Sequence, residues 1–434
     1  MSCRSRMTVL LTLLATASAA GAQESALQFS FSNPGARSLG FGGAFVALAD
    51  DATAAFANPS GLVQLTRPEI STEGRLWDYS TSFTAGGRVV GEPTGIGIDD
   101  TAGLRFGTSE NTLASLSFLS FVYPKGRWSF AFYRHQLANF EALSATDGLF
   151  ANVFDGPTRR AVDFRIFSDL EIVTWAVAAA VSISESLSLG LGLTYNKSRI
   201  AGTDEIFTHP PGGLFLPNPF RPEDQIGVQL GVVDDTDWSY TAGLLWQINR
   251  RFSLGAVYRP GPAIFIEQVV LAGPALPEPE IPPGTVLESH GFDVKLPDVY
   301  GLGFAFRARN EALTVSVEWD RVEYSDLLQS LIDGRGETSG LVQDDGDELR
   351  VGLEYAFLRS KPLVAMRFGA WRDPDHRWRF EGLNVFNRAR QDRGDDEFHL
   401  AAGVGLAFER FQIDLGVDFS DEVNTFSLSA IYTF

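Results

Sequence analysis

Apolar residues occupy every second position along several stretches of this chain, each about ten residues long. From Phe398 to Phe408, the intervening positions carry small residues and one histidine. The same alternation runs through 187–196 and 411–419. A period of two predicts β-strands whose two faces meet different environments. Ten residues are also about the length that a tilted strand needs to cross a bilayer.

Two features favour a membrane barrel over a soluble sandwich, in which the same apolar face would meet a protein core. Aromatic residues gather near the ends of the expected strands, as they do at membrane interfaces. These residues are Trp128, Trp238, Trp246, Trp319, Tyr355 and Trp371. The chain also ends in an alternating segment, FSLSAIYTF, that closes on the aromatic Phe434. We therefore predict an all-β membrane protein of the bacterial outer-membrane type.

Residues 1–22 have the features of a secretory signal peptide. Arg4 and Arg6 precede an apolar core, and Ala20-Gly21-Ala22 is a small-residue cleavage signature. The apolar core is too short to span a bilayer as a helix. Cys3, the only cysteine, lies in this segment. The mature chain is therefore expected to begin at Gln23 and to contain no disulfide and no cysteine-ligated metal.

The chain is acidic, with 54 Asp and Glu against 35 Lys and Arg, and a net charge of −19. Nucleic-acid binding requires a basic face, so this charge balance argues against it. Acidic external loops on a cell-surface protein fit the same balance.

We expect about fourteen antiparallel strands, at 70–83, 112–123, 128–141, 167–184, 187–200, 236–249, 252–268, 293–307, 313–325, 347–357, 363–372, 397–408, 411–419 and 425–434. Short turns alternate with long connections, which lie at 84–111, 142–166, 201–235, 269–292, 326–346 and 373–396. Bacterial barrels have short periplasmic turns and longer external loops. This alternation places both termini in the periplasm of a Gram-negative bacterium.

The segment Asn33–Leu62 does not have the pattern of a membrane strand. It is rich in glycine, which permits turns and close backbone approach. Asp50 or Asp51 is a suitable N-cap for a short helix over Ala52–Ala57. Asn58-Pro59 would end that helix, because the residue before proline avoids the helical region. A segment this small must pack inside something, and the barrel lumen is available.

This segment resembles the FadL-type family of outer-membrane transporters for long-chain fatty acids and other hydrophobic compounds. The residues that carry the resemblance are Gly35-Ala36-Arg37, Gly42-Gly43-Ala44, Ala49-Asp50-Asp51-Ala52 and Asn58-Pro59-Ser60-Gly61-Leu62. The family usually has alanine where Ser60 stands. The resemblance implies a 14-stranded barrel at 69–434, plugged by an N-terminal hatch at 23–68. The hatch and gating residues would be Gly42, Gly43, Asp50, Asp51, Asn58, Pro59, Ser60 and Gly61.

The resemblance also implies passive, hatch-gated transport of hydrophobic small molecules by a protein that is not an enzyme. A first substrate site would lie on apolar, proline-rich loops, with Phe207, Leu214, Phe215, Leu216 and Phe220 as candidates. A tighter internal site would involve Leu27, Phe29, Phe31, Phe41, Phe45 and Phe56. Substrates of the family are thought to leave beside a kinked third strand. The third strand here, 128–141, has no glycine or proline to mark a kink.

Several alternatives stay open at this point. The apolar loops could pack on each other instead of binding substrate, and each hatch phenylalanine could simply be hatch core. The acidic segments 344–348 and 395–397 could attract calcium, although solvated loop charge explains them too, and we predict no metal and no cofactor.

Expected partners are a hydrophobic substrate, outer-membrane lipid and lipopolysaccharide, and the barrel assembly machinery through the C-terminal strand, with the protein otherwise monomeric. A non-transporting scaffold or secretion-associated barrel that binds protein partners is the alternative function; a general polar porin is disfavoured by the hatch.

Overall fold

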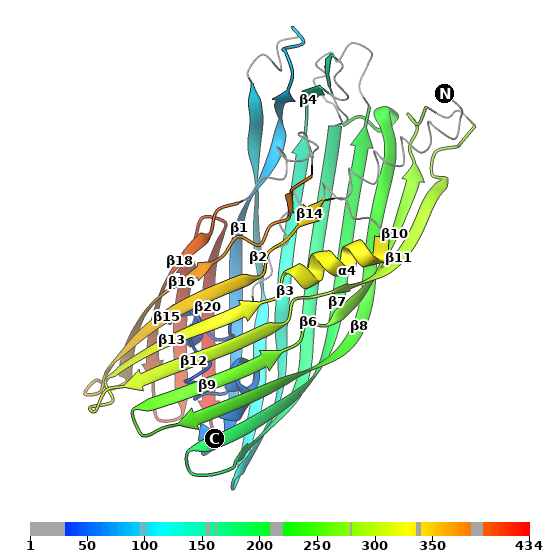
Figure 1. Cartoon of the computed structure of the whole chain (residues 1–434). Helices are drawn as coiled ribbons and strands as arrows, with labels where there is room; N and C mark the ends of the chain where they lie inside the picture. The colour runs from blue at the N-terminus through cyan, green and yellow to red at the C-terminus, as the bar shows by residue number, and fades with distance from the viewer. Residues whose placement is uncertain are drawn as a thin grey trace.

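The computed structural model describes residues 31–434 except for 96–98, 100–101, 153–156, 161–162, 209–219, 278–279, 336–339 and 383–393. Its wall is a closed barrel of fourteen antiparallel strands, which confirms the predicted fold class (Figure 1). The N-terminal segment, in dark blue, lies within the barrel near the end that carries the short turns (Figure 1). No helix in the described ranges is long and apolar enough to cross a membrane.

Each predicted strand has a counterpart in the wall. The strands are β1 (Glu69–Val90), β2 (Gly103–Lys125), β3 (Trp128–Thr146), β6 (Asp163–Ser182), β7 (Leu187–Phe207), β8 (Gln225–Gln247), β9 (Phe252–Arg259) continued by β10 (Ala263–Ala272), β11 (Val286–Lys295) continued by β12 (Val299–Arg307), β13 (Leu313–Val322), β15 (Gly346–Phe357), β16 (Leu363–Asp373), β18 (Glu397–Ala407), β19 (Phe411–Phe419) and β20 (Val423–Thr433). Two wall strands are interrupted, at Pro260-Gly261-Pro262 and at Leu296-Pro297-Asp298. Proline interrupts a sheet because it has no amide proton to donate to the neighbouring strand.

The remaining elements are short. Inside the barrel are α2 (Ala36–Gly40), α3 (Ala54–Ala57) and the 3₁₀ helix η1 (Pro59–Gln64). Among the long connections are β4 (Leu149–Asn152), β5 (Thr158–Arg160), η2 (Pro222–Asp224), α4 (Ser325–Arg335), β14 (Leu341–Val342) and β17 (Arg379–Phe380). The helix α4 packs against β11, and β14 pairs with β17.

Several strands extend well past the predicted ends, so the expected loops at 201–235 and 269–292 were too long. β7 and β8 stay paired as far as Phe207 and Gln225, and β10 and β11 reach Ala272 and Val286. Beyond the lipid, a strand no longer needs an apolar outer face, and the apolar alternation is lost in residues 197–205 of β7. The outer half of β8 keeps it, at Ile226, Val228, Leu230 and Val232. The backbone ladder continues because the neighbouring strand still satisfies its hydrogen bonds.

The outer face of the barrel is apolar, as the alternation predicts. Phe398 and Leu400 keep 69% and 67% of their surface exposed, and His399 between them points inward. β20 pairs with both β19 and β1 and so closes the barrel. Five of the six aromatic residues expected at the interfaces are exposed on the wall. The sixth, Trp371, was misplaced: it is buried in the lumen, where it stacks on His399.

Candidate functional site

The segment 33–65 is almost wholly buried inside the barrel, and glycines of the wall make room for its backbone. A Cβ atom at Gly190 would overlap the Pro59-Ser60 peptide, and one at Gly403 would lie 3.1 Å from the Gly40 Cα. Wall glycines that meet the segment in this way are Gly190, Gly243, Gly255, Gly303, Gly352, Gly369, Gly403 and Gly416. The wall glycines Gly192 and Gly405 meet other wall residues instead.

Asn58 is fully buried and makes four hydrogen bonds, three of them within the segment and one to the wall. Its Nδ2 donates to the Val46 carbonyl at 2.9 Å and to the Leu244 carbonyl of β8 at 3.1 Å. Its Oδ1 accepts from the Ser60 amide at 3.2 Å and from the Ser60 hydroxyl at 2.6 Å. The Ser60 carbonyl accepts in turn from Ser188 of β7. The Asn-Pro-Ser-Gly motif therefore acts as a docking turn.

Replacing Asn58 with alanine is expected to destabilise the folded protein by about 2–3 kcal/mol, because each buried backbone group left unpaired costs about 1–3 kcal/mol. Urea unfolding in detergent, followed by tryptophan fluorescence, measures this loss. Asn310→Ala is the matched control, since Asn310 makes one similar bond, to the Ala312 amide, in an exposed turn. Equal stability of N58A and N310A would contradict the docking role.

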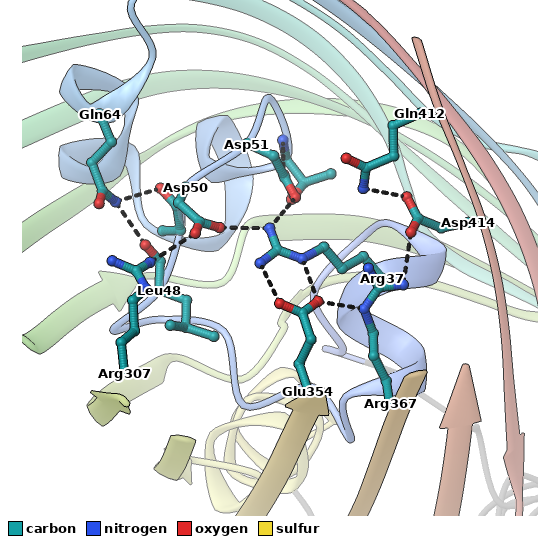
Figure 2. Close-up of polar contacts among 12 residues, drawn as sticks. Arg37, Leu48, Asp50, Asp51, Gln64, Arg307, Glu354, Arg367, Gln412 and Asp414 are labelled. Carbon is teal, nitrogen blue, oxygen red and sulfur yellow. Dashed lines mark hydrogen bonds and ion pairs between the residues drawn. The ribbon is translucent and has the colours of Figure 1, made fainter. Parts of the chain in front are cut away.

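A second anchor is centred on Arg37, whose guanidinium joins the segment to itself and to the wall (Figure 2). Its Nη1 lies 2.6 Å from Asp50 Oδ1 and 3.3 Å from Asp51 Oδ2. Its Nε and Nη2 bind both oxygens of Glu354, on β15, at 3.1 and 3.2 Å. Such two-pronged pairing fixes geometry as well as charge.

The Arg37 network extends across the wall (Figure 2). Arg367 binds Glu354 at 2.6 Å and Asp414 at 2.7 Å, and Arg307 binds the second oxygen of Asp50 at 2.7 Å. Burial alone would raise the pKa of Asp50, but Arg37 and then Arg307 lower it to about 2. The Asp50 carboxylate therefore stays charged under physiological conditions.

The predicted helix over Ala52–Ala57 is shorter than expected, since α3 covers only Ala54–Ala57. Its N-cap is Thr53 and not an aspartate. Asp51 instead binds this N-cap residue: its Oδ1 accepts from the Thr53 amide at 2.9 Å and from the Thr53 hydroxyl at 2.5 Å. Asp50 is committed to the two arginines, so neither carboxylate caps the helix directly.

The start of the described chain, residues 31–33, lies between opposite sides of the barrel. Arg75 of β1 donates to the Ser32 hydroxyl at 3.1 Å. Asn33 donates to Glu318 of β13 at 3.3 Å. The Phe31 ring lies 6.3 Å from that of Tyr324. Of the three predicted N-terminal ligand residues, Leu27 and Phe29 lie outside the described residues.

Arg350 occupies a charged layer beside the segment. It contacts Asp320 at 3.2 Å and also Glu348, and its guanidinium lies 3.9 Å from the Trp371 ring centre. Arg350, like Arg37, is therefore paired with internal acids.

Next to the segment, toward the end with the long loops, lies an apolar layer inside the barrel. Its buried members are Trp77, Tyr79, Ala138, Phe140, Ala142, Leu170, Ile172, Ile264, Phe292, Val294, Leu296 and Leu327. They come from β1, β3, β6, β10, β11, the β11–β12 break and α4. Phe31 packs against this layer, so the N-terminal segment borders it directly.

The wall has a seam between β2 and β3 beside the apolar layer. The two strands pair from Lys125↔Trp128 to Phe118↔His135 and no farther. Beyond that point β2 pairs only with β1, and β3 only with β6. The register shifts at the same level in both strands, leaving Ser117 and Leu137 as extra residues. The third strand is therefore irregular at its bulge, although it contains no glycine or proline that would mark this in the sequence.

Side chains bridge the seam where the backbone ladder is missing. The Ser115 hydroxyl contacts Gln136, and Asn111 donates to the Glu141 carbonyl at 3.2 Å. Tyr79 of β1 donates to the Asn139 carbonyl at 2.7 Å. On the lipid side, a groove of about 590 Å³ runs over β20, β1 and β2, and Ser115 is one of its lining residues. The seam thus borders the apolar layer on the inside, and the outer groove reaches one of its two strands, β2.

The predicted ligand residues are divided among three places. Phe41 and Phe45 are buried in the core of the segment against its own alanines. Phe56 faces Tyr133 and His135 of β3, with ring centres 6.2 and 4.3 Å away. Phe207 and Phe220 meet at 5.4 Å on the rim of the barrel. Leu214, Phe215 and Leu216 lie outside the described residues.

The apolar layer was not among the predicted ligand residues. A signal exists, because buried positions on β3 change from odd to even numbers across Leu137: Tyr133 and His135 precede the bulge, and Ala138 and Phe140 follow it. A change of phase in the alternation marks a bulge, and the inward-facing residues after it, Ala138, Phe140 and Ala142, are the contribution of β3 to the layer.

Comparison with known proteins agrees with this architecture. A family model described as outer membrane protein transport protein (OMPP1/FadL/TodX) matches residues 11–355. A FadL homologue from Pseudomonas aeruginosa has 16% identity and a TM-score of 0.63, over 94% of this chain and 99% of the other. The toluene transporter TbuX from Ralstonia pickettii has 14% identity and a TM-score of 0.58, over 93% and 99%.

The toluene transporter TodX from Pseudomonas putida has 12% identity and a TM-score of 0.56, over 93% of this chain and 99% of the other. At these identities the likeness to solved structures is one of fold. Among curated proteins, none matches the sequence significantly. The family match spans most of the chain, so this protein is an outer-membrane β-barrel that belongs to the FadL/TodX family of outer-membrane transport proteins.

Proposed function

We propose that this protein carries hydrophobic small molecules, such as long-chain fatty acids or aromatic hydrocarbons, passively across the outer membrane. The observation that carries the proposal is the apolar layer, which borders the seam in the wall of a barrel from this family. The interior of a pore for polar solutes is lined by polar residues, not by a buried layer of aromatic and aliphatic side chains. The transport requires no chemical step, so no catalytic role is assigned.

The relatives and the energetics support this substrate class. Similar folds include proteins described as toluene transporters and as a monoaromatic hydrocarbon channel. Burial of each CH₂ group contributes about 0.8 kcal/mol. A hydrophobic ligand can therefore bind with few polar contacts.

The proposed path begins at the rim and ends in the membrane. Phe207 and Phe220 would make the first contacts with substrate at the outer end. The N-terminal segment, whose Phe31 lies beside the apolar layer, would gate access to it. Substrate would then leave sideways at the seam, where only side chains join β2 to β3. Residues 23–68 serve as the hatch in this scheme, and the signal peptide 1–22 is removed.

The orientation and the remaining partners follow from the same scheme. The short turns and both termini would face the periplasm, as even-stranded bacterial barrels have them. The apolar outer face would contact outer-membrane lipid and lipopolysaccharide, and β20 would present the assembly signal. A single chain closes the barrel, so we propose a monomer.

The binding role of the apolar layer can be tested with a fluorescent long-chain fatty acid. Phe140→Asn should weaken its binding to the detergent-solubilised protein at least tenfold, because full burial of a Phe side chain is worth about 1.5–3 kcal/mol. Leu143→Asn, on the outer face of the same strand, is the matched control and should bind as the wild type does. Equal affinity of F140N and L143N, both with the heat-sensitive gel mobility of a folded barrel, would refute the assignment.

A further inference from the structure

A cluster of three potential metal ligands lies inside the barrel where β16 ends and β18 begins. It consists of Asp373, Glu397 and His399, each offering one donor atom, and these atoms all lie within 4.8 Å of one another. Asp373 and Glu397 are direct cross-strand neighbours, and His399 lies two residues farther along β18. An inward-facing position on adjacent strands is a rigid support for a binding site.

His399 is oriented as a metal-binding histidine usually is. It is 3% exposed, and its Nδ1 lies 3.3 Å from Asp418 Oδ1. Asp418 is fixed in turn by the Trp371 Nε1, at 2.9 Å, and Trp371 stacks on the imidazole with ring centres 3.7 Å apart. Because a carboxylate can only accept, Nδ1 carries the proton in a neutral ring and Nε2 carries the lone pair. A carboxylate behind the ring is the usual outer partner of a metal-bound histidine.

The inner side of the cluster contains atoms without hydrogen-bond partners. Among the described residues, neither His399 Nε2 nor the buried Asp373 Oδ1 has one, although Asp373 Oδ1 lies 3.5 Å from His376 Nδ1 in a longer ion pair. Glu397 uses Oε1 to accept from the Glu422 amide at 2.6 Å, and its Oε2 faces His399 Nε2 at 3.7 Å. Buried polar atoms without partners are uncommon in proteins, so two in one cluster require an explanation.

The surroundings add room and negative charge. A cavity of about 20 Å³ lies beside Asp373 and Glu397, enough for about one water molecule or ion. Its lining contains three more acids, Asp375, Asp395 and Glu422, against the cations Arg377 and His376. Excess negative charge around a small cavity favours a cation.

From this arrangement we propose that Asp373, Glu397 and His399 bind a divalent transition-metal ion such as Zn²⁺. One imidazole nitrogen and two carboxylate oxygens are a set that zinc accepts, with bonds of about 2.0–2.2 Å. At tetrahedral angles such bonds place the donors about 3–4 Å apart, so small side-chain rotations suffice to bring them together. The imidazole nitrogen favours zinc over calcium and magnesium, which prefer oxygen ligands. The bound ion would tie the outer end of β16 to that of β18, independently of any hydrophobic substrate.

The test is a Zn²⁺ titration of the full mature protein, purified in detergent and freed of metal with EDTA, by isothermal calorimetry. The wild type should bind about one Zn²⁺ per chain. His399→Asn should weaken binding at least tenfold, and Asp418→Asn should weaken it about tenfold through loss of the outer partner. His290→Asn and Glu288→Gln are the matched controls, because both residues lie exposed on β11, and neither change should alter binding.

Glu397→Gln provides a second test in case the His399→Asn variant does not fold. It keeps the size of the side chain and the hydrogen bond to Glu422, and should also lose at least tenfold in Zn²⁺ affinity. Folding of every variant is checked by heat-sensitive gel mobility. Absence of saturable Zn²⁺ binding by the folded wild type would overturn the proposal. So would wild-type affinity in folded E397Q, which would leave a buried imidazolium–carboxylate pair as the explanation of the cluster.

Discussion

Deletion of Leu137 is expected to reduce uptake of a hydrophobic substrate at least tenfold while the barrel still folds. Leu137 is the extra residue in β3, between Gln136, which pairs with Val173, and Ala138, which pairs with Ile172. Removing it lets β3 pair with β6 without interruption and straightens the strand at the seam. A straighter β3 can extend its ladder to β2 beyond Phe118, which would close the proposed exit.

Uptake is measured with a radiolabelled fatty acid in cells that lack their own transporter and express the variant. Leu137→Ala is the matched control, since it keeps the chain length and the bulge and should transport within about twofold of the wild type. Binding of the fluorescent fatty acid to purified protein should survive the deletion, because the apolar layer remains. A folded deletion variant with wild-type uptake would show that substrate does not leave through the seam.

Replacing Arg37 with alanine is expected to loosen the hatch and to raise the ion conductance of the barrel several-fold. Arg37 contacts Asp50 and Asp51 in the hatch and Glu354 in the wall. Its loss leaves three carboxylates close together, with Arg307 and Arg367 as the remaining cations nearby. Breaking a buried ion pair by removing one partner costs about 3–5 kcal/mol. This cost destabilises the docked state of the hatch relative to an undocked state.

Single-channel recording in planar bilayers measures the conductance. The matched control is Arg321→Ala, which also removes an arginine that binds two aspartates, Asp345 and Asp347, but near the outer rim. R321A should conduct as the wild type does. If R37A kept the low conductance of the wild type, the Arg37 network would not be what holds the hatch in place.

The fold was predictable because each membrane strand carries a regular alternation of apolar residues. A lipid-facing surface requires an apolar residue at every second position, so all fourteen strands could be recognised. The hatch was predictable for another reason: its glycines and the Asn58-Pro59 turn have no place in a membrane strand. Docking of Asn58 against the Leu244 carbonyl and the close approach of Gly190 give that reasoning a structural basis.

Other features depend on neighbours that a sequence does not reveal. The outer half of β7 carries polar residues and has the pattern of a loop, yet cross-strand hydrogen bonds to β8 keep it extended. The bulges at Ser117 and Leu137 contain neither glycine nor proline, so only the partner strands expose them. Phe41 and Phe45 illustrate the same limit: an exposed lining and a packed core look identical in sequence, and both residues are buried in the hatch.

The most direct test of the central claim compares hydrophobic and polar solutes in the same cells. Cells that express the wild-type protein should take up radiolabelled oleate or toluene at least tenfold faster than cells with an empty vector. Uptake of radiolabelled glucose at limiting concentration should be the same in both. Faster glucose uptake would indicate a polar pore. Oleate and toluene uptake at the empty-vector rate would instead favour a scaffold that binds other proteins, and either result would contradict hydrophobic transport.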